Sequence, residues 1–300
     1  DGEVTVDYTG SSPQRRGPIN ATLASTESAT YYLFMAVTDP TIPSNYGCYL
    51  PIHLIAPEGS VVNAMPPAPV VGRMAISHTI TNVLFSALSQ ALPDRVTAAY
   101  YGMSNIHTFA GESGSGKSWI FLDIEVGGWG ARPTKDGLDC HSQGVHNLAN
   151  TPIEMVEVTY PLRFQRYELI PDTGGAGRFR GGLGAARDIE FLDERGSLNT
   201  QFDKFKVAPF GLFGGGPGGR AQLLLESEGR TQALRSKTVN RPLERGDVLR
   251  MRTQGGGGYG DPRQRDPSLI LRDLREGKVT PEGVRRDYGL DPDALGAQPS

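Results

Sequence analysis

The sequence predicts an α+β fold, with mainly antiparallel β-sheet in the middle and helices near the N-terminal third and at the C-terminus. Three observations support this prediction: helical apolar spacing early in the chain, short β-rich runs divided by glycine turns in the middle, and helix start and stop signals near the end. Because few middle connections can hold a crossover helix, the strands there should pair antiparallel. We expect sub-regions 1–95 (mixed α/β), 96–260 (β-rich) and 261–300 (C-terminal helices).

The first third should contain one strand and two helices. Apolar residues alternate over 4–8, which indicates a strand. Residues 21–37 are apolar and contain neither Gly nor Pro, which favours a buried helix. Residues 74–92 keep apolar positions at helical spacing up to Pro93, so this segment should be an amphipathic helix that faces the core.

The middle of the chain should form strands, and the end should form two short helices. Asp266 and Thr280 each precede a proline, the pattern of an N-cap before a helix, while Gly277 and Gly289 stand where glycine ends a helix. The expected strands cover residues 119–126, 153–160, 163–170, 185–192, 222–226 and 248–252.

Glycine is concentrated in three bunches, at 174–184, 214–219 and 255–260. Repeated glycine implies turns that need positive φ, or a backbone that must approach something closely. Arg178 and Arg180 lie inside the first bunch. This bunch is therefore either a tight strand connection or a backbone cradle for a ligand, with the two arginines beside it.

The composition excludes several kinds of partner. The 300 residues carry a net charge of −3 from interspersed charges, so no footprint for nucleic acid or an anionic membrane is visible. The longest apolar run, 31–37, is far shorter than the roughly 20 residues of a membrane span. Cys48 and Cys140 alone make neither a disulfide framework nor a metal motif. We expect a soluble, cytoplasmic protein with a small-molecule or protein partner.

Residues 111–118, GESGSGKS, match the nucleotide-binding P-loop pattern letter for letter. The phosphate-binding mechanism requires a strand before the loop and a helix that begins at its Lys-Ser pair. Here Lys117 and Ser118 lead into the β-rich run WIFLDIEV, so the context is a hairpin. We therefore reject an ATP site at this position.

A polar loop at 127–154 holds the densest chemistry of the chain. Such a loop can converge carboxylates, imidazoles and amides on one ligand, or it can be a surface loop whose polar groups satisfy turns. His141 and His146 are five residues apart and match no zinc signature, so we assign no metal ligand. The remaining histidines, His53, His78 and His107, stand alone in the sequence and are expected to be structural.

Several motifs occur in one order along almost the whole chain: KDGLDCHSQGVHNLANTP from 135, NTPIEMVEVTYPLRFQRYELIPDTGGAGRFRGGLG from 150, APFGLFGGGPGG from 208 and GDVLRMRTQGGGGYGDPRQRDP from 246. With DYTGSSPQRRGPIN near the start, they resemble the hydantoinase B/oxoprolinase family. By this resemblance, residues 1–300 are an N-terminally incomplete part of a hydantoinase B-like subunit or domain.

The resemblance implies a hydrolytic subunit in ATP-dependent opening of cyclic amides such as hydantoin, N-methylhydantoin or 5-oxoproline. It also implies a hetero-oligomer in which a hydantoinase A-like partner binds ATP and phosphorylates the amide oxygen. ATP then belongs on the partner, and a divalent metal belongs on the N-terminal part that this chain lacks. Two alternatives stay open: a subunit of an ATP-dependent ketone carboxylase, and a non-catalytic scaffold that completes the partner's active site.

The candidate site residues lie in the polar loop and the first glycine bunch. Water attack on an activated amide needs a base, and we assign this role to Asp136, Asp139 or His141. An anionic intermediate needs donors, which Arg178 and Arg180 can supply unless they form salt bridges that rigidify a turn. We assign substrate binding to the two arginines together with Asn147 and Asn150.

Overall fold

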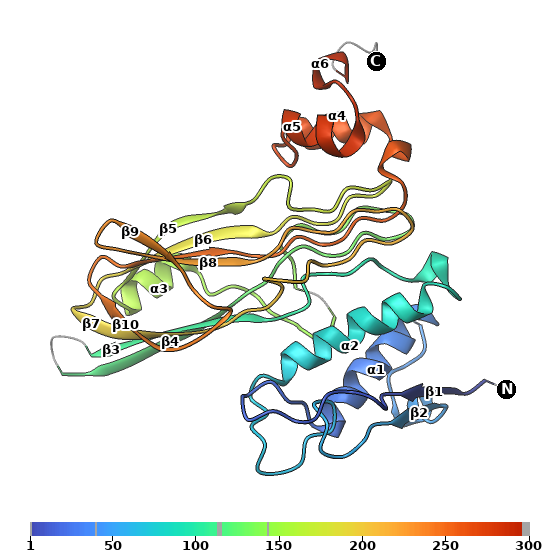
Figure 1. Ribbon diagram of the computed structural model, residues 1–300, viewed down its shortest axis with the longest axis horizontal. Coiled ribbons are helices and arrows are strands. Elements are labelled where there is room, and N and C mark those ends of the chain that lie inside the picture. Colours follow the sequence, from blue (N-terminus) through green and yellow to red (C-terminus); the bar gives the residue numbers. More distant parts are fainter. Residues whose placement is uncertain (1, 40, 113–115, 143, 296–300) are drawn as a thin grey trace. The chain divides into compact units, whose positions relative to one another are not determined.

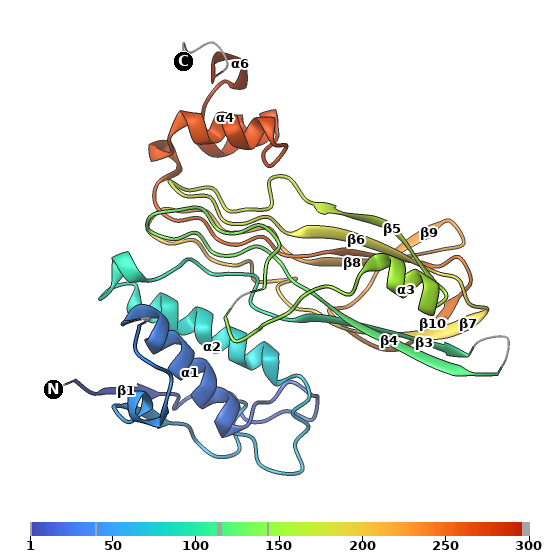
Figure 2. The same cartoon turned by 180° about the vertical axis from the view of Figure 1, so that it is seen from behind.

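The computed structural model describes residues 2–39, 41–112, 116–142 and 144–295. The chain forms two compact units. Unit 1 contains Asp1–Val96 and Gln143–Asn147, and unit 2 contains Thr97–Ser142 and Leu148–Ser300 (Figures 1 and 2). Antiparallel sheets dominate, and helices lie in the N-terminal third and at the C-terminus, so the predicted α+β class is confirmed.

Unit 1 is built on two helices that pack together. Helix α1 begins after Thr22, whose hydroxyl accepts a hydrogen bond from the Ser25 amide, and it buries Ala29, Leu33 and Val37 at helical spacing. Helix α2 ends at Leu88, earlier than predicted, because a short 3₁₀ turn forms at Pro93–Arg95. The elements are β1 (Val4–Asp7), α1 (Leu23–Val37), β2 (Ile52–Ile55) and α2 (Arg73–Leu88), with β1 and β2 parallel.

Unit 2 contains two antiparallel sheets that share one hydrophobic core. Phe109 and Leu198 of the first sheet and Ile189 and Met251 of the second are fully buried in this core. The first sheet has the strand order β10-β7-β3-β4, and the second has the order β5-β6-β11-β8-β9. The strands are β3 (Asn105–Glu112), β4 (Ser118–Glu125), β5 (Leu162–Leu169), β6 (Ala185–Phe191), β7 (Arg195–Gln201), β8 (Gln222–Ser227), β9 (Arg230–Ala233), β10 (Lys237–Glu244) and β11 (Val248–Arg252).

One predicted strand, 153–160, is wrong. The segment Ile153–Thr159 is a short helix, α3, that starts after Pro152. Its β-branched residues suggested a strand, but only Val156 is buried, while Val158 is 86% exposed. Only one side chain of this two-turn helix, Val156, is buried in the core. So short a helix cannot be separated from a strand by sequence periodicity.

Strands β3 and β4 form the hairpin that the sequence predicted in place of a nucleotide loop. They pair antiparallel from Asn105 opposite Glu125 to Glu112 opposite Ser118. Strand β4 begins at Ser118, so the position where a P-loop requires a helix is extended. Residues 113–115 of the motif lie outside the described residues.

The glycine-rich segments form a bundle of extended chains, which we call the glycine bundle: residues 97–103, 127–141, 172–184, 208–219 and 253–260. The chains bond through their backbones; Gly182 N donates to Trp129 O and Gly256 N donates to Gly182 O, both at 2.8 Å. A Cβ on Gly256 would lie 1.8 Å from Trp129 O, so glycine is required for the close approach. The segments run side by side beyond the strands in Figure 1.

The end of the chain is helical, as predicted. Asp266 and Thr280 cap helices α4 (Pro267–Arg275) and α5 (Pro281–Gly283), accepting hydrogen bonds from Ser268 N and Gly283 N. Gly277 and Gly289 have φ of 69° and 67°, the left-handed conformation expected after a helix. A π-helical turn (Val284–Tyr288) and α6 (Pro292–Leu295) follow. None of the described helices is long and apolar enough to cross a bilayer.

Candidate functional site

Asp136, Asp139 and Arg180, three of the predicted site residues, line one pocket of about 450 Å³ in unit 2. The glycine bundle provides one side of the pocket, and α4 with the segment after it provides the other. The two acidic residues come from the polar loop and the arginine from the first glycine bunch, so the bundle brings together residues that are about forty positions apart in the chain.

The Asp136 carboxylate is held by two arginines. Arg265 donates to both of its oxygens at 2.7 and 2.8 Å, and the backbone amide of Arg180 donates to Oδ1 at 2.7 Å. Burial opposes ionisation of this carboxyl group, but the hydrogen bonds and charge of Arg265 outweigh burial and hold the pKa of Asp136 below its usual value. Asp136 is therefore ionised at neutral pH and is a weak base.

Arg180 is 2% exposed and bonds to acceptors on every side. Its Nε donates to Asp273 Oδ2 at 3.1 Å, and its Nη1 donates to Asp139 Oδ1 at 3.2 Å and to Gly181 O at 2.6 Å. Asp139 also accepts from Leu183 N and lies 3.2 Å from Lys278 Nζ. This geometry is the salt-bridge alternative of the sequence prediction, and it ties α4 to the glycine bundle.

The other predicted site residues lie outside this network. His141 is exposed and stacks obliquely on Trp129, whose indole Nε1 donates to the His141 carbonyl at 2.8 Å. Arg178 is exposed and lies over the Phe179 ring at 5.5 Å. Asn147 is exposed and belongs to unit 1. Asn150 donates a hydrogen bond to the hydroxyl of Tyr167, which belongs to a second site.

The second site, which we call the Arg187 cluster, was missed by the sequence prediction. Arg187 is fully buried, and its Nη1 contacts Asp123 Oδ2 at 3.0 Å and Glu125 Oε1 at hydrogen-bond distance. His107 Nδ1 lies 3.9 Å from Glu125 Oε1. The rings of Phe164 and Tyr167 lie 4.6 and 5.0 Å from the guanidinium carbon, so the cation is also held by two aromatic faces.

Many polar atoms of the Arg187 cluster are buried without a hydrogen-bond partner among the described residues. They are both ring nitrogens of His107, Glu125 Oε2, and Nε and Nη2 of Arg187. Burial raises the pKa of Glu125 to about 7 despite the opposing charge of Arg187, and burial lowers the pKa of His107 well below its usual value. The cluster thus contains a carboxyl group that can accept or release a proton near neutral pH.

Tyr167 connects the Arg187 cluster to the polar loop. Its hydroxyl accepts from Asn150, and burial, with smaller effects of Cys140 and Glu125, raises its pKa to about 12. Burial also raises the pKa of the Cys140 thiol to about 12, so this cysteine is neutral and donates to Val126 O at 3.6 Å. Tyr167 therefore interacts with Asn150 and Cys140 of the polar loop and with Arg187 of the cluster.

A metal can in principle be held by one imidazole and two carboxylates, and the ligand atoms of His107, Asp123 and Glu125 lie within 4.8 Å of one another. Arg187, however, already contacts an oxygen of each carboxylate through one nitrogen. A divalent ion would add charge beside this buried guanidinium. Arg187 is thus the cation of this cluster, whereas the metal that the family resemblance implies was expected on an N-terminal part and not at these residues.

A signal for the Arg187 cluster does exist in the sequence. Asp123 and Glu125 are two apart in an otherwise apolar strand, so both side chains point to the same face of β4. His107 pairs directly with Asp123 across the hairpin, and Arg187 lies in the fully buried part of β6. Charged residues on the inward face of a strand mark a buried ionic site, and this pattern is the signal that could have located the cluster.

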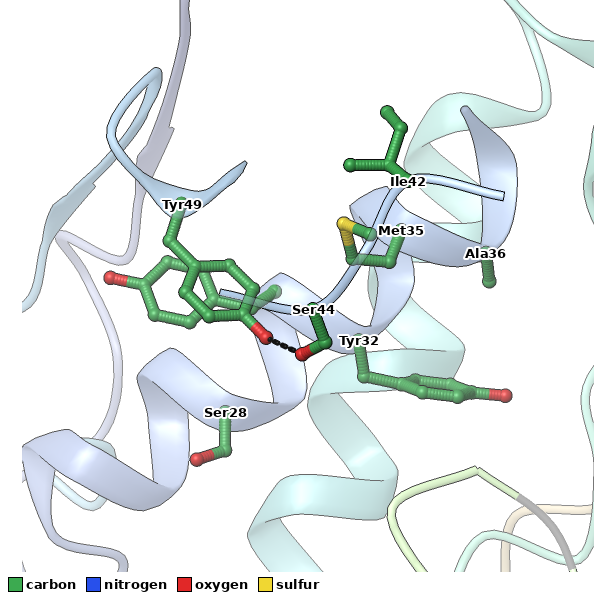
Figure 3. A pocket seen from close by; sticks show the side chains of 8 residues that line it. Ser28, Tyr32, Met35, Ala36, Ile42, Ser44 and Tyr49 are labelled. Atoms are coloured by element: carbon green, nitrogen blue, oxygen red, sulfur yellow. Dashed lines mark hydrogen bonds between the residues drawn. The ribbon is translucent and has the colours of Figure 1, made fainter. Parts of the chain in front are cut away.

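Unit 1 contains a separate, mostly apolar pocket of about 540 Å³. Figure 3 shows Met35 of α1 beside Ile42 and a hydrogen bond between the hydroxyls of Ser44 and Tyr49, which lie 2.6 Å apart. The residues that line it include no carboxylate, imidazole or amine, so this pocket has no group for acid–base chemistry at neutral pH.

Two histidines that appeared isolated in the sequence have neighbours in space. In unit 1, His78 of α2 meets His146 edge to face with ring centroids 5.6 Å apart, and burial lowers the pKa of His78 to about 3. His107 lies beside Glu125 in unit 2. Isolation in the sequence therefore does not mean isolation in space, and the expectation that these histidines are structural stays a prediction.

The chain is an antiparallel α+β protein with a glycine bundle and two ionic sites, and residues of one of these sites line a pocket. The chain belongs to the hydantoinase B/oxoprolinase family, whose model matches residues 1–262. The resemblance predicted from the motifs is thereby confirmed.

Relatives and solved structures agree with this assignment. The B-type subunit of a putative D-/L-hydantoinase from a Pseudomonas species (strain NS671) is 35% identical over 297 residues, covering 96% of this chain and 50% of that protein. The crystal structure of ATP-dependent caprolactamase from Pseudomonas jessenii matches with a TM-score of 0.83 at 28% identity, covering 96% of this chain and 52% of that one. The chain spans about half the length of these relatives.

A nucleotide-free structure of acetone carboxylase matches with the same TM-score of 0.83, at 19% identity and over 96% of this chain and 43% of that one. At this identity the match shows that the fold is shared. The family fold thus occurs both in an amide hydrolase and in a ketone carboxylase.

Proposed function

We propose that this chain is the hydrolytic subunit, or part of it, of an ATP-dependent cyclic-amide hydrolase that acts with a hydantoinase A-like ATP-binding partner. The observation that carries the proposal is the match of 96% of the chain to a B-type hydantoinase subunit at 35% identity. The caprolactamase structure, at 28% identity, supports the same reaction class, since a lactam is a cyclic amide. The hydantoinase relative and the caprolactamase beta subunit are each one subunit of a larger enzyme, which favours a hetero-oligomer.

A division of labour between subunits follows from chemistry. A ring amide is stabilised by resonance, and transfer of a phosphoryl group to its oxygen weakens the C–N bond and provides a leaving group. The motif at 111–118 begins in strand β3 and ends in strand β4, which pair with each other, so ATP is assigned to the partner. This chain then contributes groups that bind the activated ring and accept a proton from water.

The roles of the site residues are part of this proposal. Asp136 and Asp139 bond to Arg265, Arg180 and Lys278, and we propose that they hold the pocket in shape. His141 is the exposed ionisable group among the three predicted bases. Glu125, with a pKa of about 7, is a further candidate for proton transfer through Tyr167.

The deciding experiment is reconstitution of the assembly. The chain would be co-expressed with its partner and the remaining half of the subunit, and ATP-dependent release of ring-opened product would be measured for hydantoin, N-methylhydantoin, 5-oxoproline and ε-caprolactam. Turnover of at least one ring with matching ATP consumption is expected. Consumption of ketone that requires bicarbonate, without ring opening, would instead establish the carboxylase alternative.

The scaffold alternative is tested in the same assembly by the substitutions Asp136→Asn, Asp139→Asn and His141→Gln. Asparagine preserves the shape of aspartate, and glutamine is a neutral polar replacement for histidine. The melting temperature of the complex checks that each variant folds. Full turnover in all three variants would show that these side chains are not needed for catalysis and would favour a scaffold role for the chain. The cytoplasmic location predicted from the sequence stays a prediction.

A further inference from the structure

The pocket that holds Asp136 and Asp139 is surrounded by more cations than its carboxylates neutralise. Arg132, Lys135 and Arg272 line it together with Lys278, in addition to the buried Arg180. Arg272 is about half exposed and lies 3.9 Å from Asp136 Oδ2. Five lining residues are basic (Arg132, Lys135, Arg180, Arg272, Lys278) and two are acidic (Asp136, Asp139). With their ion-pair partners Arg265, Asp273 and Glu276 the sum is six basic against four acidic residues, an excess of two positive charges.

Arg132, one of the lining cations, is held in place and has one donor without a partner among the described residues. Arg132 is oriented by its Nη2, which donates to the Asp136 carbonyl at 2.9 Å, and by the Trp129 ring 5.7 Å from its guanidinium carbon. Its Nε is buried without a hydrogen-bond partner among the described residues. Desolvation lowers the pKa of Arg132, so a neighbouring negative charge would be favourable there.

The same pocket has an apolar wall. Leu138, Phe179 and Leu269 line it beside the cations. Its volume of about 450 Å³ lies within the usual range for small-molecule sites, roughly 300–1,000 Å³. The pocket can therefore hold a compact apolar body and a multiply charged anionic group at the same time.

We propose that this pocket binds the dianionic phosphoryl group of a small phosphorylated compound, with the apolar part of the compound against Phe179 and Leu269. Two negative charges match the excess of two positive charges around the pocket. The inference rests on the proposed function for the identity of the compound, a ring amide phosphorylated on oxygen by the partner. The binding chemistry itself depends only on the charges and the wall.

The test is calorimetric titration of the full chain with phenyl phosphate at fixed ionic strength, with inorganic phosphate and ATP as comparison ligands. One phenyl phosphate per chain is expected, bound more tightly than inorganic phosphate because of the apolar wall. Lys135→Gln and Arg272→Gln should each weaken binding about tenfold, the usual result of losing one charge-assisted hydrogen bond. Arg275→Gln, the same charge change on α4 outside the pocket lining, should change it less than about twofold.

Three results would overturn the site: no saturable binding of phenyl phosphate, equal weakening by Arg275→Gln, or tighter binding of ATP than of phenyl phosphate. Both pocket variants change side chains at the pocket edge, and an unchanged melting temperature would confirm that they fold. The titration needs neither partner nor turnover. If the chain binds phenyl phosphate but the assembly opens no ring, the proposed function is rejected and the binding site is kept. If the assembly opens a ring but the chain does not bind phenyl phosphate, the binding site is rejected and the proposed function is kept.

Discussion

Three arginines described in unit 2 are buried between carboxylates: Arg180 and Arg265, which share one network, and Arg187. The environments of Arg180 and Arg187 differ. Arg180 and Arg187 are each at most 2% exposed. Arg180 donates from Nε, Nη1 and Nη2 to Asp273, Asp139 and a backbone carbonyl. Arg187 bonds through Nη1 alone, and its Nε and Nη2 have no partner among the described residues.

The difference comes from what surrounds each guanidinium. The glycine bundle exposes backbone groups at close range, so Gly181 O and Leu183 N can complete the Arg180 network. Around Arg187 the backbone is used in the sheet, and the faces of Phe164 and Tyr167 provide no strong acceptor. In the Arg180 network the hydrogen bonds and charge of Arg265 outweigh burial and lower the pKa of Asp136. Beside Arg187 burial dominates and raises the pKa of Glu125.

The largest effect is expected when the satisfied network loses its cation. Arg180→Met leaves the buried Asp273 with Arg265 alone and the partly buried Asp139 with Lys278 alone, and should lower the free energy of unfolding by about 3–5 kcal/mol. Denaturant titration measures this loss. Arg178→Met, at an exposed arginine two residues earlier, should stay within about 0.5 kcal/mol. Similar losses in both variants would show that the network contributes nothing specific.

The next effect tests the glycine bundle that supports Arg180. Gly256→Ala places a Cβ 1.8 Å from Trp129 O, so the bundle must shift, at a cost of about 3 kcal/mol. Gly216→Ala is the matched control in the same bundle, because its Cβ would meet nothing closer than 3.5 Å and its φ needs no glycine. Thermal unfolding of both variants separates the two cases, and an equally unstable Gly216→Ala would contradict the close-approach explanation.

A smaller, pH-dependent effect is expected at the Arg187 cluster. The pKa of Glu125 rises from 4.5 to about 7 on folding, so the folded state favours its protonated form. This group therefore lowers stability as pH rises from 4.5 to 7, by up to about 3 kcal/mol at ~1.4 kcal/mol per pH unit. Glu125→Gln should remove that part of the pH dependence.

The measurement for Glu125 is the free energy of unfolding between pH 5 and pH 8. Glu228→Gln, in the exposed β8–β9 turn, serves as the control and should keep the wild-type slope. A Glu125→Gln slope equal to that of the wild type would show that this carboxyl group does not titrate in the window, and the contrast between the two arginine sites would then disappear.

The smallest effect is expected outside both networks. Lys117→Ala alters the P-loop-like motif, which is part of a hairpin, and should leave ATP binding by the assembled complex unchanged within about twofold. Equilibrium binding of a fluorescent ATP analogue checks this. A loss of tenfold or more would restore the motif as a nucleotide site.

Much of the fold could be predicted from local sequence. Asp266, Thr280, Gly277 and Gly289 mark helix ends because capping depends on residues only a few positions apart. Strands β4, β5, β6, β8 and β11 were predicted from short β-rich runs between glycine turns, whereas β7, β9 and β10 were not among the expected strands. Segment 153–160 failed because a helix of seven residues, four of them β-branched, is too short for periodicity to separate it from a strand, and Val156 of this helix packs into the core of unit 2.

The candidate site could be predicted in part. Asp136, Asp139 and Arg180 were found through the glycine-marked polar loop, and the structure brings them to one pocket. Arg265 and Asp273, which complete this network, lie more than ninety residues from Arg180 or Asp136 and carry no local mark. The pairing of His107 with Asp123 depends on strand register, which local patterns specify weakly before the sheet is known.

The sequence by itself determined the family, the fold class and the helix caps, and it located the glycine bunches without deciding between turns and close approach. Each of these depends on residue type and short spacing. Only the tertiary structure decided which chains and charges meet, and therefore that Arg180 bonds through all three of its nitrogens while burial raises the pKa of Glu125 beside Arg187 to about 7. Burial and electrostatic interaction are properties of atoms close in space, and folding brings those atoms together from distant parts of the chain.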